Sequence, residues 1–370
     1  MRKIMCVAGA RPNFMKVAPI MQALHATPDL ESMLVHTGQH YDLAMNEVFF
    51  DELRIPRPDR SLNVGSGSHA VQTAQVMLAI EPVIEEVRPD VVVVVGDVNS
   101  TLAAALVAAK LGVSMAHVEA GLRSFDRTMP EEINRVLTDQ VATLLFTTER
   151  SAEANLAREG IAVERVRFVG NVMIDSLRAC LSRAVPARET LAAAGRQTPI
   201  EAPEGFALLT LHRPSNVDDR KTLGDLLQTI RLVSDMLPVV FPAHPRTARR
   251  IADAGLDAVF EESRIVRLEP VGYLAMLGLM RDARLVLTDS GGVQEETTGL
   301  GVPCLTLRSN TERPITIEEG TNELVGRDRG LILAKTRDIL ATGGKTGRVP
   351  ELWDGRSAER IAAHLAEGVP

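Results

Sequence analysis

Hydrophobic and polar positions along the chain alternate between two patterns. Short, nearly continuous apolar runs predict strands buried in a sheet, and the longer stretches between them, apolar at helical spacing, predict helices. The five valines of Val91–Val95 are typical of a parallel strand covered on both faces. In the first half the predicted strands are Lys3–Ala8, Met33–Thr37, Val91–Val95, Ser114–Val118, Leu144–Thr147 and Arg167–Val169. The predicted helices there include Ala70–Val87, Thr101–Lys110 and Glu132–Val141.

The alternation weakens between Ala179 and Glu204, a segment with three prolines and no strand pattern, and then resumes. This break predicts two α/β domains of doubly wound, Rossmann-like type. The second set of predicted strands is Ala207–Leu211, Val239–Pro242, Ile265–Leu268, Leu285–Leu287, Cys304–Leu307 and Leu331–Leu333. We expect a first domain of residues 1–178, a connection of 179–204 and a second domain of 205–355. The amphipathic C-terminal stretch, 356–370, is expected to return to the first domain.

Composition fits this picture and excludes several classes of protein. A chain of 370 residues is long for one core, which also favours two domains. Aromatic residues are only 3% and the net charge is -7 without a basic block, so a nucleic-acid partner is not expected. No apolar run approaches the roughly 18 residues of a membrane-spanning helix. The three cysteines are far apart in the sequence, and we expect them to be buried and reduced, as in a cytoplasmic protein.

Polar motifs follow the predicted strands of the first domain, where ligands of open α/β sheets bind. "GARPNFMKVAPI" places Arg11 and Lys16 at the start of a helix, where the dipole disfavours cations. Two cations there indicate a bound anion, and a solvated surface pair is the alternative. Asp97 in "GDVNST" follows the valine strand and points either to catalysis or to a helix cap.

Acidic residues accumulate after the next strand, in "HVEAGLRSFDRTMPEEINR". Glu131 and Glu132 follow Pro130 in a first helical turn, where the dipole stabilises acids. That explanation accounts for one of them but not for Glu119 at the strand end. Carboxylates that face one another are suited to general acid/base chemistry, because their environments can separate their pKa values.

In the second domain, two pairs of histidine and arginine follow successive strands. His212 and Arg213 lie in "LTLHRPSNVDD", and His244 and Arg246 lie in "FPAHPRT". A single histidine is usually structural, but two such pairs at neighbouring strand ends favour a ligand site.

The stretch "TDSGGVQEE" has the features of a phosphate-binding turn. Ser290, Gly291 and Gly292 offer a hydroxyl and backbone N–H groups at a helix start. Glu296, one turn further on, is suited to two ribose hydroxyls, and Arg313 in "NTERP" is a further candidate for the phosphates. No G-x-G-x-x-G follows a strand, so NAD is not indicated, and Gly343–Thr346 lacks the first glycine of a P-loop because Ile339 stands there.

These motifs, in their order and spacing from Gly9 to about Gly326, resemble the non-hydrolysing UDP-N-acetylglucosamine 2-epimerases. The resemblance implies a GT-B-like fold, with two Rossmann-like domains and the active site in the interdomain cleft. It implies an isomerase that interconverts UDP-GlcNAc and UDP-ManNAc by eliminating UDP to 2-acetamidoglucal and adding it back. It also implies no cofactor, no metal, a homodimer and a cytoplasmic location.

By the same resemblance each candidate has a role, although which carboxylate removes the C2 proton stays open. Gln39 and His40 match an allosteric substrate site, but the Tyr41-Asp42 that follows departs from the usual Arg-Glu. Met276 stands where many members carry an aromatic residue near the uracil. The catalytic candidates are Asp97, Glu119, Glu131 and His212. The substrate-binding candidates are Arg11, Lys16, Arg135, His244, Met276, Ser290, Gly291, Gly292, Glu296 and Arg313.

Four alternatives stay open from the sequence. One is a 2-epimerase of a modified sugar such as UDP-2,3-diacetamido-2,3-dideoxyglucuronate, which needs an extra cation for the sugar carboxylate. Another is a GT-B glycosyltransferase, which needs an acceptor site and does not need three carboxylates near C2. A hydrolysing epimerase and a UDP-sugar-binding regulator are the remaining two.

Overall fold

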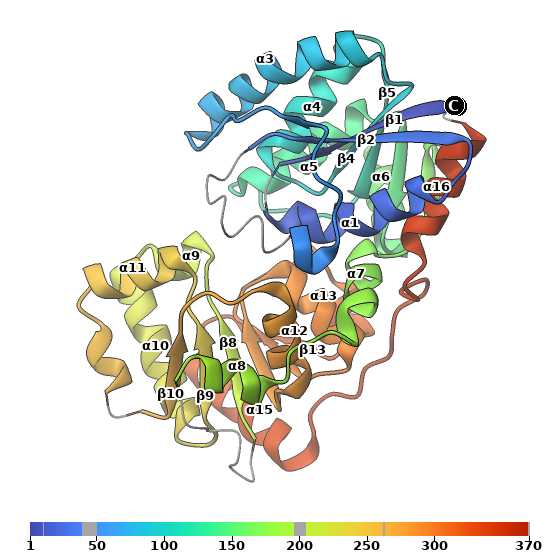
Figure 1. Cartoon of the computed structure of the whole chain (residues 1–370). Helices are drawn as coiled ribbons and strands as arrows, with labels where there is room; N and C mark the ends of the chain where they lie inside the picture. The colour runs from blue at the N-terminus through green and yellow to red at the C-terminus, as the bar shows by residue number, and fades with distance from the viewer. Residues whose placement is uncertain (10, 39–49, 196–204, 262, 369–370) are drawn as a thin grey trace. The chain divides into compact units, whose positions relative to one another are not determined.

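The computed structural model describes residues 1–9, 11–38, 50–195, 205–261 and 263–368 (Figure 1). The chain divides into two compact units. The first unit comprises Met1–Ala179 together with Glu351–Pro370, and the second comprises Cys180–Pro350. Each unit is a parallel sheet with helices on its faces, so the prediction of two Rossmann-like α/β domains is confirmed.

The first unit has a seven-stranded sheet in the order β3-β2-β1-β4-β5-β6-β7. Every residue of β4 is buried, as its run of valines predicts. All six predicted strands are present, and β3 is an addition that the hydrophobic pattern does not show, because both of its residues are polar and exposed. The strands are β1 Arg2–Ala8, β2 Leu30–His36, β3 Arg60–Ser61, β4 Val91–Val95, β5 Ser114–Ala120, β6 Leu144–Thr147 and β7 Val166–Phe168.

The C-terminal segment packs within the first unit. The backbone N–H of Ala358, in the first turn of α16 (Ser357–Glu367), donates to the carboxylate of Asp175 at 2.7 Å. The buried Trp353 indole donates to the carbonyl of Thr148 at 3.0 Å. The other helices of this unit are α1 Arg11–His25, α3 His69–Val87, α4 Asn99–Lys110, α5 Pro130–Val141, α6 Arg150–Arg158, the 3-10 turn η1 Val163–Arg165, and α7 Val172–Leu181, which runs into the second unit.

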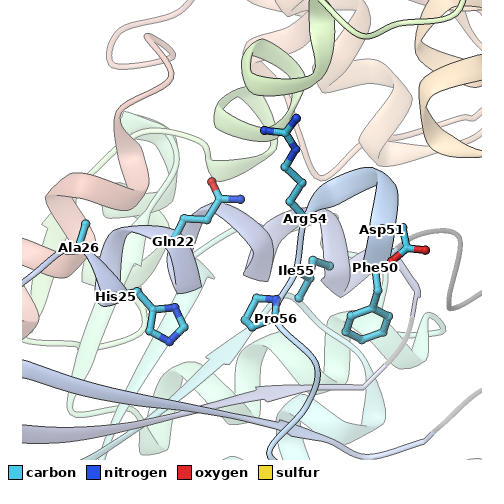
Figure 2. A pocket seen from close by; sticks show the side chains of 8 residues that line it. All are labelled: Gln22, His25, Ala26, Phe50, Asp51, Arg54, Ile55 and Pro56. Carbon is cyan, nitrogen blue, oxygen red and sulfur yellow. The ribbon is translucent and has the colours of Figure 1, made fainter.

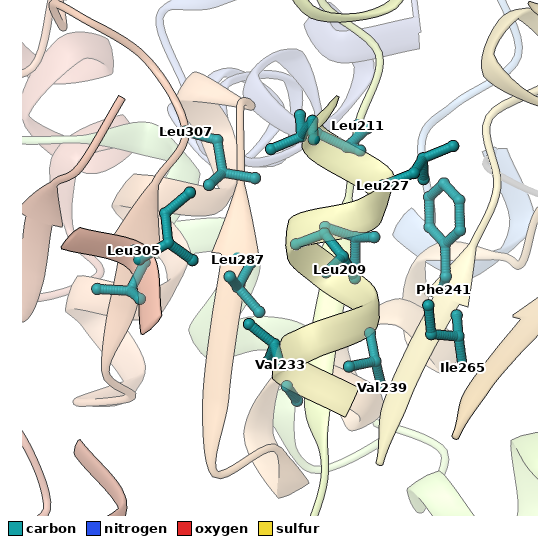
Figure 3. Packing of buried hydrophobic residues seen from close by; sticks show 14 of the residues in the cluster. Leu209, Leu211, Leu227, Val233, Val239, Phe241, Ile265, Leu287, Leu305 and Leu307 are labelled. Carbon is teal, nitrogen blue, oxygen red and sulfur yellow. The ribbon is translucent and has the colours of Figure 1, made fainter. Parts of the chain in front are cut away.

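The second unit has a six-stranded sheet in the order β10-β9-β8-β11-β12-β13. Its core is aliphatic: strand residues such as Leu209 and Leu287 pack with Val233 of α10 (Figure 3). The strands are β8 Ala207–Thr210, β9 Val239–Pro242, β10 Ile265–Leu268, β11 Leu285–Thr288, β12 Cys304–Thr306 and β13 Asn322–Leu324. The helices are α8 Ala187–Ala193, α9 Pro214–Val217, α10 Arg220–Ser234, α11 Pro245–Asp253, η2 Asp257–Phe260, α12 Tyr273–Asp282, α13 Gly291–Leu300, α14 Ile315–Glu318 and α15 Arg329–Thr342. No helix in the described part of the chain is long and apolar enough to cross a membrane.

The predicted strand Leu331–Leu333 is wrong, because these residues lie in α15. Asp328 caps this helix by accepting a hydrogen bond from the Leu331 N–H at 2.9 Å. Ile332, Thr336 and Ile339 are its buried residues, and their spacing is that of one helical face. The last strand of the sheet is β13 instead.

Each sheet has a point at which the strand order reverses, between β1 and β4 in the first unit and between β8 and β11 in the second. Loops that leave adjacent strands on opposite sides open a crevice at such a point, and ligands of open α/β sheets bind there. The motifs "GARPNF" and "GDVNST" follow β1 and β4, and "HRPSN" and "DSGG" follow β8 and β11. The fold therefore places the polar motifs of each unit at its own reversal point.

Candidate active site

The reversal point of the first unit carries a group of five polar residues, which we call the first-unit group: Asn13, Lys16, Asp97, Glu119 and Arg135. Lys16 donates from Nζ to Glu119 Oε2, and their side chains are only 8% and 3% exposed. Asn13 anchors the start of α1 by donating to the carbonyl of Val95 at 2.8 Å. Removing either partner of a buried ion pair of this kind would leave an uncompensated charge.

Glu119 occupies an unusual backbone position at the end of β5. Its φ is +69°, a left-handed conformation that non-glycine residues rarely adopt. The pairing of β5 with β6 shifts register between Val118 and Ala120, so Glu119 is the extra residue of a β-bulge. Bulges re-aim a side chain at the end of a sheet, and strained residues of this kind concentrate at functional sites.

Gly96 lies beside this pair and needs to be glycine. Its φ is +70°, and a Cβ there would lie 3.1 Å from Lys16 Nζ and 3.6 Å from Glu119 Oε2. Asp97 directly follows the turn at Gly96, and its Oδ2 accepts a hydrogen bond from Arg135 Nε at 3.0 Å. The Asp97 side chain remains 26% exposed.

The capping explanation for Asp97 is wrong. The N-cap of α4 is Val98, which makes no side-chain cap hydrogen bond. Asp97 therefore stands before the helix, and Asn134 donates to its backbone carbonyl at 2.8 Å.

The two adjacent acids of α5 differ in their contacts. Glu132 is buried and accepts hydrogen bonds from the backbone of Ser124 and Phe125, both at 2.9 Å, and it pairs with Arg135. Glu132 thus anchors a loop, a role that the sequence did not distinguish from that of its neighbour. Glu131 is half-buried in the same first turn.

Three predicted residues cannot be placed in full. Arg11 is the first residue of α1, but its side chain lies outside what the structure describes, as do Gln39 and His40.

The second-unit group lies at the reversal point of the second sheet and comprises His212, Arg213, Asn216 and Asp289. Asp289 is fully buried and accepts from the backbone N–H of His212 at 3.1 Å and of Arg213 at 3.0 Å. Its carboxylate also lies 3.0 Å from His212 Nδ1 and accepts from the Asn216 amide at 3.1 Å. Asp289 was not among the predicted site residues, although its place directly after an apolar strand was a signal.

Burial would raise the pKa of Asp289, but His212 and the donated hydrogen bonds outweigh burial and lower it. The ionised carboxylate therefore holds the proton of His212 on Nδ1. The imidazole, 39% exposed, keeps Nε2 for a ligand, because no hydrogen bond among the described residues uses that atom.

His244 lies next to His212, with the two ring centroids 6.1 Å apart. It is exposed at the N-cap of α11, where its Nδ1 accepts from the Arg246 N–H at 3.2 Å. The two histidine motifs found in the sequence therefore meet at one place in the second unit.

The glycine turn at the start of α13 is packed closely against the side chains of Arg313 and Glu312. A Cβ on Gly291 would lie 2.5 Å from Arg313 Nη1 and 2.8 Å from Glu312 Oε1. Arg313 pairs with Glu295 at 2.7 Å and with Glu312 at 2.5 Å, and its side chain is only 7% exposed. Arg313, which the sequence suggested as a contact of the phosphates, thus supports the turn from within the chain.

Ser290 is the N-cap of α13, but its side chain makes no cap hydrogen bond. Its N–H donates to Thr288 Oγ1 at 2.9 Å. A phosphate at this turn would therefore meet the N–H groups of Gly291 and Gly292, which have no partner within the first turn of a helix.

Glu296 lies one turn inside α13 and is 3% exposed. Burial and the neighbouring Glu295 raise its pKa to about 7, against a hydrogen bond from the Tyr273 hydroxyl to Oε1 at 2.9 Å. Met276 is partly buried on the same helix as Tyr273. Tyr273 was not among the predicted residues, because its contact with Glu296 forms only in the folded chain.

A pocket of about 710 Å³ lies elsewhere in the first unit (Figure 2). It is lined by Gln22 and His25 of α1, by Ala26 directly after that helix, and by residues of the segment 50–56. None of the predicted site residues lines it, so we do not place the chemistry there.

Comparison with known proteins gives one consistent family. Residues 22–366 match the family model of UDP-N-acetylglucosamine 2-epimerase. The chain is 43% identical to the UDP-N-acetylglucosamine 2-epimerase of Methanocaldococcus jannaschii, over 99% of both chains. It is 42% identical to the UDP-2,3-diacetamido-2,3-dideoxy-D-glucuronate 2-epimerase of Pseudomonas aeruginosa, again over 99% of both. The crystal structure of the M. jannaschii enzyme in complex with UDP-GlcNAc and UDP superimposes with a TM-score of 0.87, covering 99% of this chain and 100% of that one.

Proposed function

The chain belongs to the UDP-N-acetylglucosamine 2-epimerase family and is an epimerase, and we propose that it interconverts UDP-GlcNAc and UDP-ManNAc by elimination and re-addition of UDP. The relative from M. jannaschii carries this name, and its structure holds UDP-GlcNAc and UDP. One observation from the structure carries the proposal furthest. It is the strained, bulged Glu119, buried against Lys16 and beside Gly96, which directly precedes Asp97.

The proposed chemistry follows from the substrate. C2 of the sugar has no adjacent carbonyl, so its proton is not acidic enough for simple removal. A base takes this proton while the bond between C1 and the diphosphate oxygen breaks, which forms 2-acetamidoglucal and UDP. UDP then adds back to C1 as a proton is delivered to the other face of C2. The sequence of steps needs a base, an acid and stabilisation of the departing diphosphate.

The first-unit group and the neighbouring motif residue Glu131 of α5 supply the acid and the base in this proposal. Asp97, Glu119 and Glu131 are the three candidates, and their surroundings differ. Glu119 is buried against an ammonium group, whereas Asp97 is partly exposed against the Arg135 guanidinium. Different surroundings allow one carboxyl to work as acid while another works as base.

The second-unit group and α13 hold UDP in this proposal. His212, oriented by Asp289, donates from Nε2 toward the departing diphosphate when both of its ring nitrogens carry protons, with His244 beside it. The N–H groups of Gly291 and Gly292 receive the phosphates and Glu296 the ribose hydroxyls. Arg11 adds a cation, Arg313 supports the turn, and Met276 lines the uracil site.

Two further expectations stay proposals. We place the enzyme in the cytoplasm, which is supported by three buried cysteines without disulfide bonds. We also propose a homodimer, supported by apolar side chains exposed on α3 and α5: Leu78 is 73% exposed, Ile133 43% and Leu137 45%. The proposed allosteric site at Gln39 and His40 gains no support from the described residues.

The similarity to the P. aeruginosa enzyme favours a second candidate substrate, the diacetamido-uronate sugar. The test is proton NMR of the purified enzyme in deuterium oxide, with each nucleotide sugar in turn and no added NAD. Deuterium at C2 of UDP-ManNAc formed from UDP-GlcNAc would support the first proposal. Exchange only with the diacetamido-uronate would replace it by the second, and exchange with neither would contradict both.

A further inference from the structure

His117 is a fully buried histidine on β5, two residues before Glu119, and the proposed chemistry does not use it. Both of its ring nitrogens face oxygen atoms. Nδ1 lies 2.6 Å from Asp139 Oδ1, and Nε2 lies 2.8 Å from the backbone carbonyl of Gly96. All of these groups belong to the first unit.

The partners of His117 determine where its protons are. The Gly96 carbonyl can only accept a hydrogen bond, so Nε2 must carry a proton. Asp139 is fully buried, and its Oδ2 accepts from the Gly121 N–H at 3.0 Å and from Arg123 at 2.6 Å. Burial would raise the pKa of Asp139, but His117 and Arg123 outweigh it and lower that pKa. The Arg123 guanidinium at 2.6 Å pairs with Asp139 as an ionised acceptor, and Nδ1 of His117 then donates to it as well.

The charges around the ring balance only when the imidazole is protonated. Arg123 is shared between Asp139 and Glu159, with 2.6 Å to each. Asp139 and Glu159 carry two negative charges, and the Arg123 guanidinium supplies one positive charge. A protonated His117 supplies the second. A neutral His117 would leave an excess negative charge beside a fully buried carboxylate, which is costly.

The same hydrogen bonds reach the two turns that carry the proposed acid and base. Gly96, which accepts from His117, directly precedes Asp97, and its own N–H donates to the carbonyl of Val118 at 3.0 Å. Gly121, which donates to Asp139, lies two residues after Glu119. Both turns have left-handed backbone, with φ of +70° at Gly96 and +69° at Glu119. Such conformations persist only where surrounding contacts hold them.

We propose that His117 is held as a buried imidazolium and is a positioning residue, which with Asp139 fixes the turns bearing Asp97 and Glu119. The proposal rests on the proposed function for the roles of Asp97 and Glu119, but the charge of His117 does not. A protonated ring that ties both turns keeps the two carboxylates at a set separation. Catalysis is sensitive to such placement, because a displacement of about 1 Å can cost about 100-fold in rate.

The first experiment is nitrogen–proton correlation NMR of the whole enzyme labelled in its histidine side chains, near neutral pH. The His117 signals are assigned by their loss in His117→Gln, and the exposed His25 at the end of α1 serves as an internal reference for a solvated ring. We expect a proton on both His117 nitrogens, slow to exchange with water. A single ring proton on His117 would overturn the proposal.

The second experiment measures turnover, UDP affinity and melting temperature for His117→Gln, Asp139→Asn and the double variant. Each single change leaves one uncompensated charge and lowers the melting temperature, whereas the double variant keeps neutral amides facing one another and recovers part of that loss. In folded His117→Gln we expect kcat to fall about 10- to 100-fold with unchanged affinity for UDP. We expect Asp97→Asn to cost less in that background than in the wild type.

The outcomes separate the two proposals. If Asp97→Asn and Glu119→Gln abolish turnover but folded His117→Gln keeps the wild-type kcat, positioning by His117 is wrong and the proposed function stands. If His117 carries both protons but neither carboxylate substitution slows the enzyme, the proposed function fails and with it the positioning role. If the double variant loses as much melting temperature as the two single variants together, the proposed charge balance is contradicted.

Discussion

At Glu119 the backbone adopts a conformation that its residue type disfavours, and the side chain is buried against Lys16. Left-handed backbone at a non-glycine residue costs of the order of 1 kcal/mol or more, which the surrounding structure must offset. A single extra residue in β5 re-aims the carboxylate that strand alternation would otherwise direct elsewhere. Strain of this kind is concentrated at functional sites, which supports the proposed role of Glu119.

Substitution of the three carboxylates tests their proposed roles. We expect Asp97→Asn, Glu119→Gln and Glu131→Gln each to lower kcat by at least about 100-fold, because each change removes a proton donor or acceptor. Turnover is followed by NMR with UDP affinity measured in parallel. Glu85→Gln, at an exposed position of α3, is the control and should keep the wild-type rate. Near-normal rates in all three variants with UDP binding intact would exclude the assignment.

Glu296 predicts a pH dependence of stability. Its pKa is raised from 4.5 to about 7 in the folded protein, so between these values the folded state binds a proton that the unfolded chain has lost. Its contribution to folding is complete below pH 4.5 and is lost as the pH rises through 7. Each pKa unit corresponds to about 1.4 kcal/mol. At pH 8 the free energy of unfolding of Glu296→Gln should therefore exceed that of the wild type by up to about 3 kcal/mol.

Thermal unfolding from pH 5 to pH 8 measures this effect. The melting temperature of Glu296→Gln should rise relative to the wild type as the pH increases, whereas the exposed Glu269→Gln should follow the wild type throughout. Parallel curves for Glu296→Gln and the wild type would show that the buried carboxyl does not titrate in this range.

Residue types and strand ends sufficed to select most of the candidate residues, but not their partners. Gly291 was predicted from its motif, yet the close contact that requires glycine comes from Arg313 and Glu312, more than twenty positions away. Asp289 and Glu132 escaped selection because hydrogen bonds made by folding distinguish them from other acids. Such contacts leave no periodic signal in a sequence.

At the scale of elements, burial on both faces made most strands predictable within one or a few residues. β13 was missed because its sequence is Asn-Glu-Leu, and its Asn322 is buried through hydrogen bonds rather than apolar contacts. That amide donates to the carbonyl of Gln294 at 3.2 Å. Conversely, the apolar run Leu331–Leu333 belongs to a helix because Asp328 caps it. Edge strands and short apolar runs are therefore the elements that pattern alone cannot assign.

A large buried side chain contributes to holding the segment that returns to the first unit. Trp353 is 1% exposed, and its indole is tied to Thr148. Trp353→Ala should destabilise the first unit by about 3–5 kcal/mol, the range for a large aromatic residue truncated in a core. Val349→Ala, at a position 47% exposed nearby, should change stability by less than about 0.5 kcal/mol.

Urea unfolding and proteolysis of the segment before α16 measure this loss. Cleavage there should accelerate in Trp353→Ala and not in Val349→Ala. Equal resistance of both variants would mean that α16 is held without the tryptophan.

At the scale of the whole molecule, the two units repeat one plan. In each sheet the strand order reverses beside the first strand of that unit, and the polar groups lie on loops at that point. Length and the broken alternation of patterns were enough to predict two such units. The assembly of copies is not encoded in strand patterns, because it depends on which apolar side chains remain exposed after folding.

The proposed homodimer can be tested on the exposed apolar residues of α3 and α5. A wild-type mass of about twice 40.1 kDa by light scattering is expected, because burying these side chains between copies removes them from water. The double variant Leu78→Glu/Ile133→Glu should shift to the monomer mass. Val163→Glu, at a position 74% exposed on η1, should remain a dimer. A monomeric wild type, or a dimeric double variant, would exclude this interface.

Elimination of UDP is the central claim, and positional isotope exchange tests it most directly. UDP-GlcNAc is labelled with oxygen-18 in the bridge between C1 and the β-phosphorus and followed by phosphorus NMR during turnover. Breaking the C1–O bond frees the β-phosphate to rotate, so the label should appear in non-bridging positions at a rate comparable to epimerisation. Epimerisation with deuterium entering C2 while all of the label stays in the bridge would contradict the account.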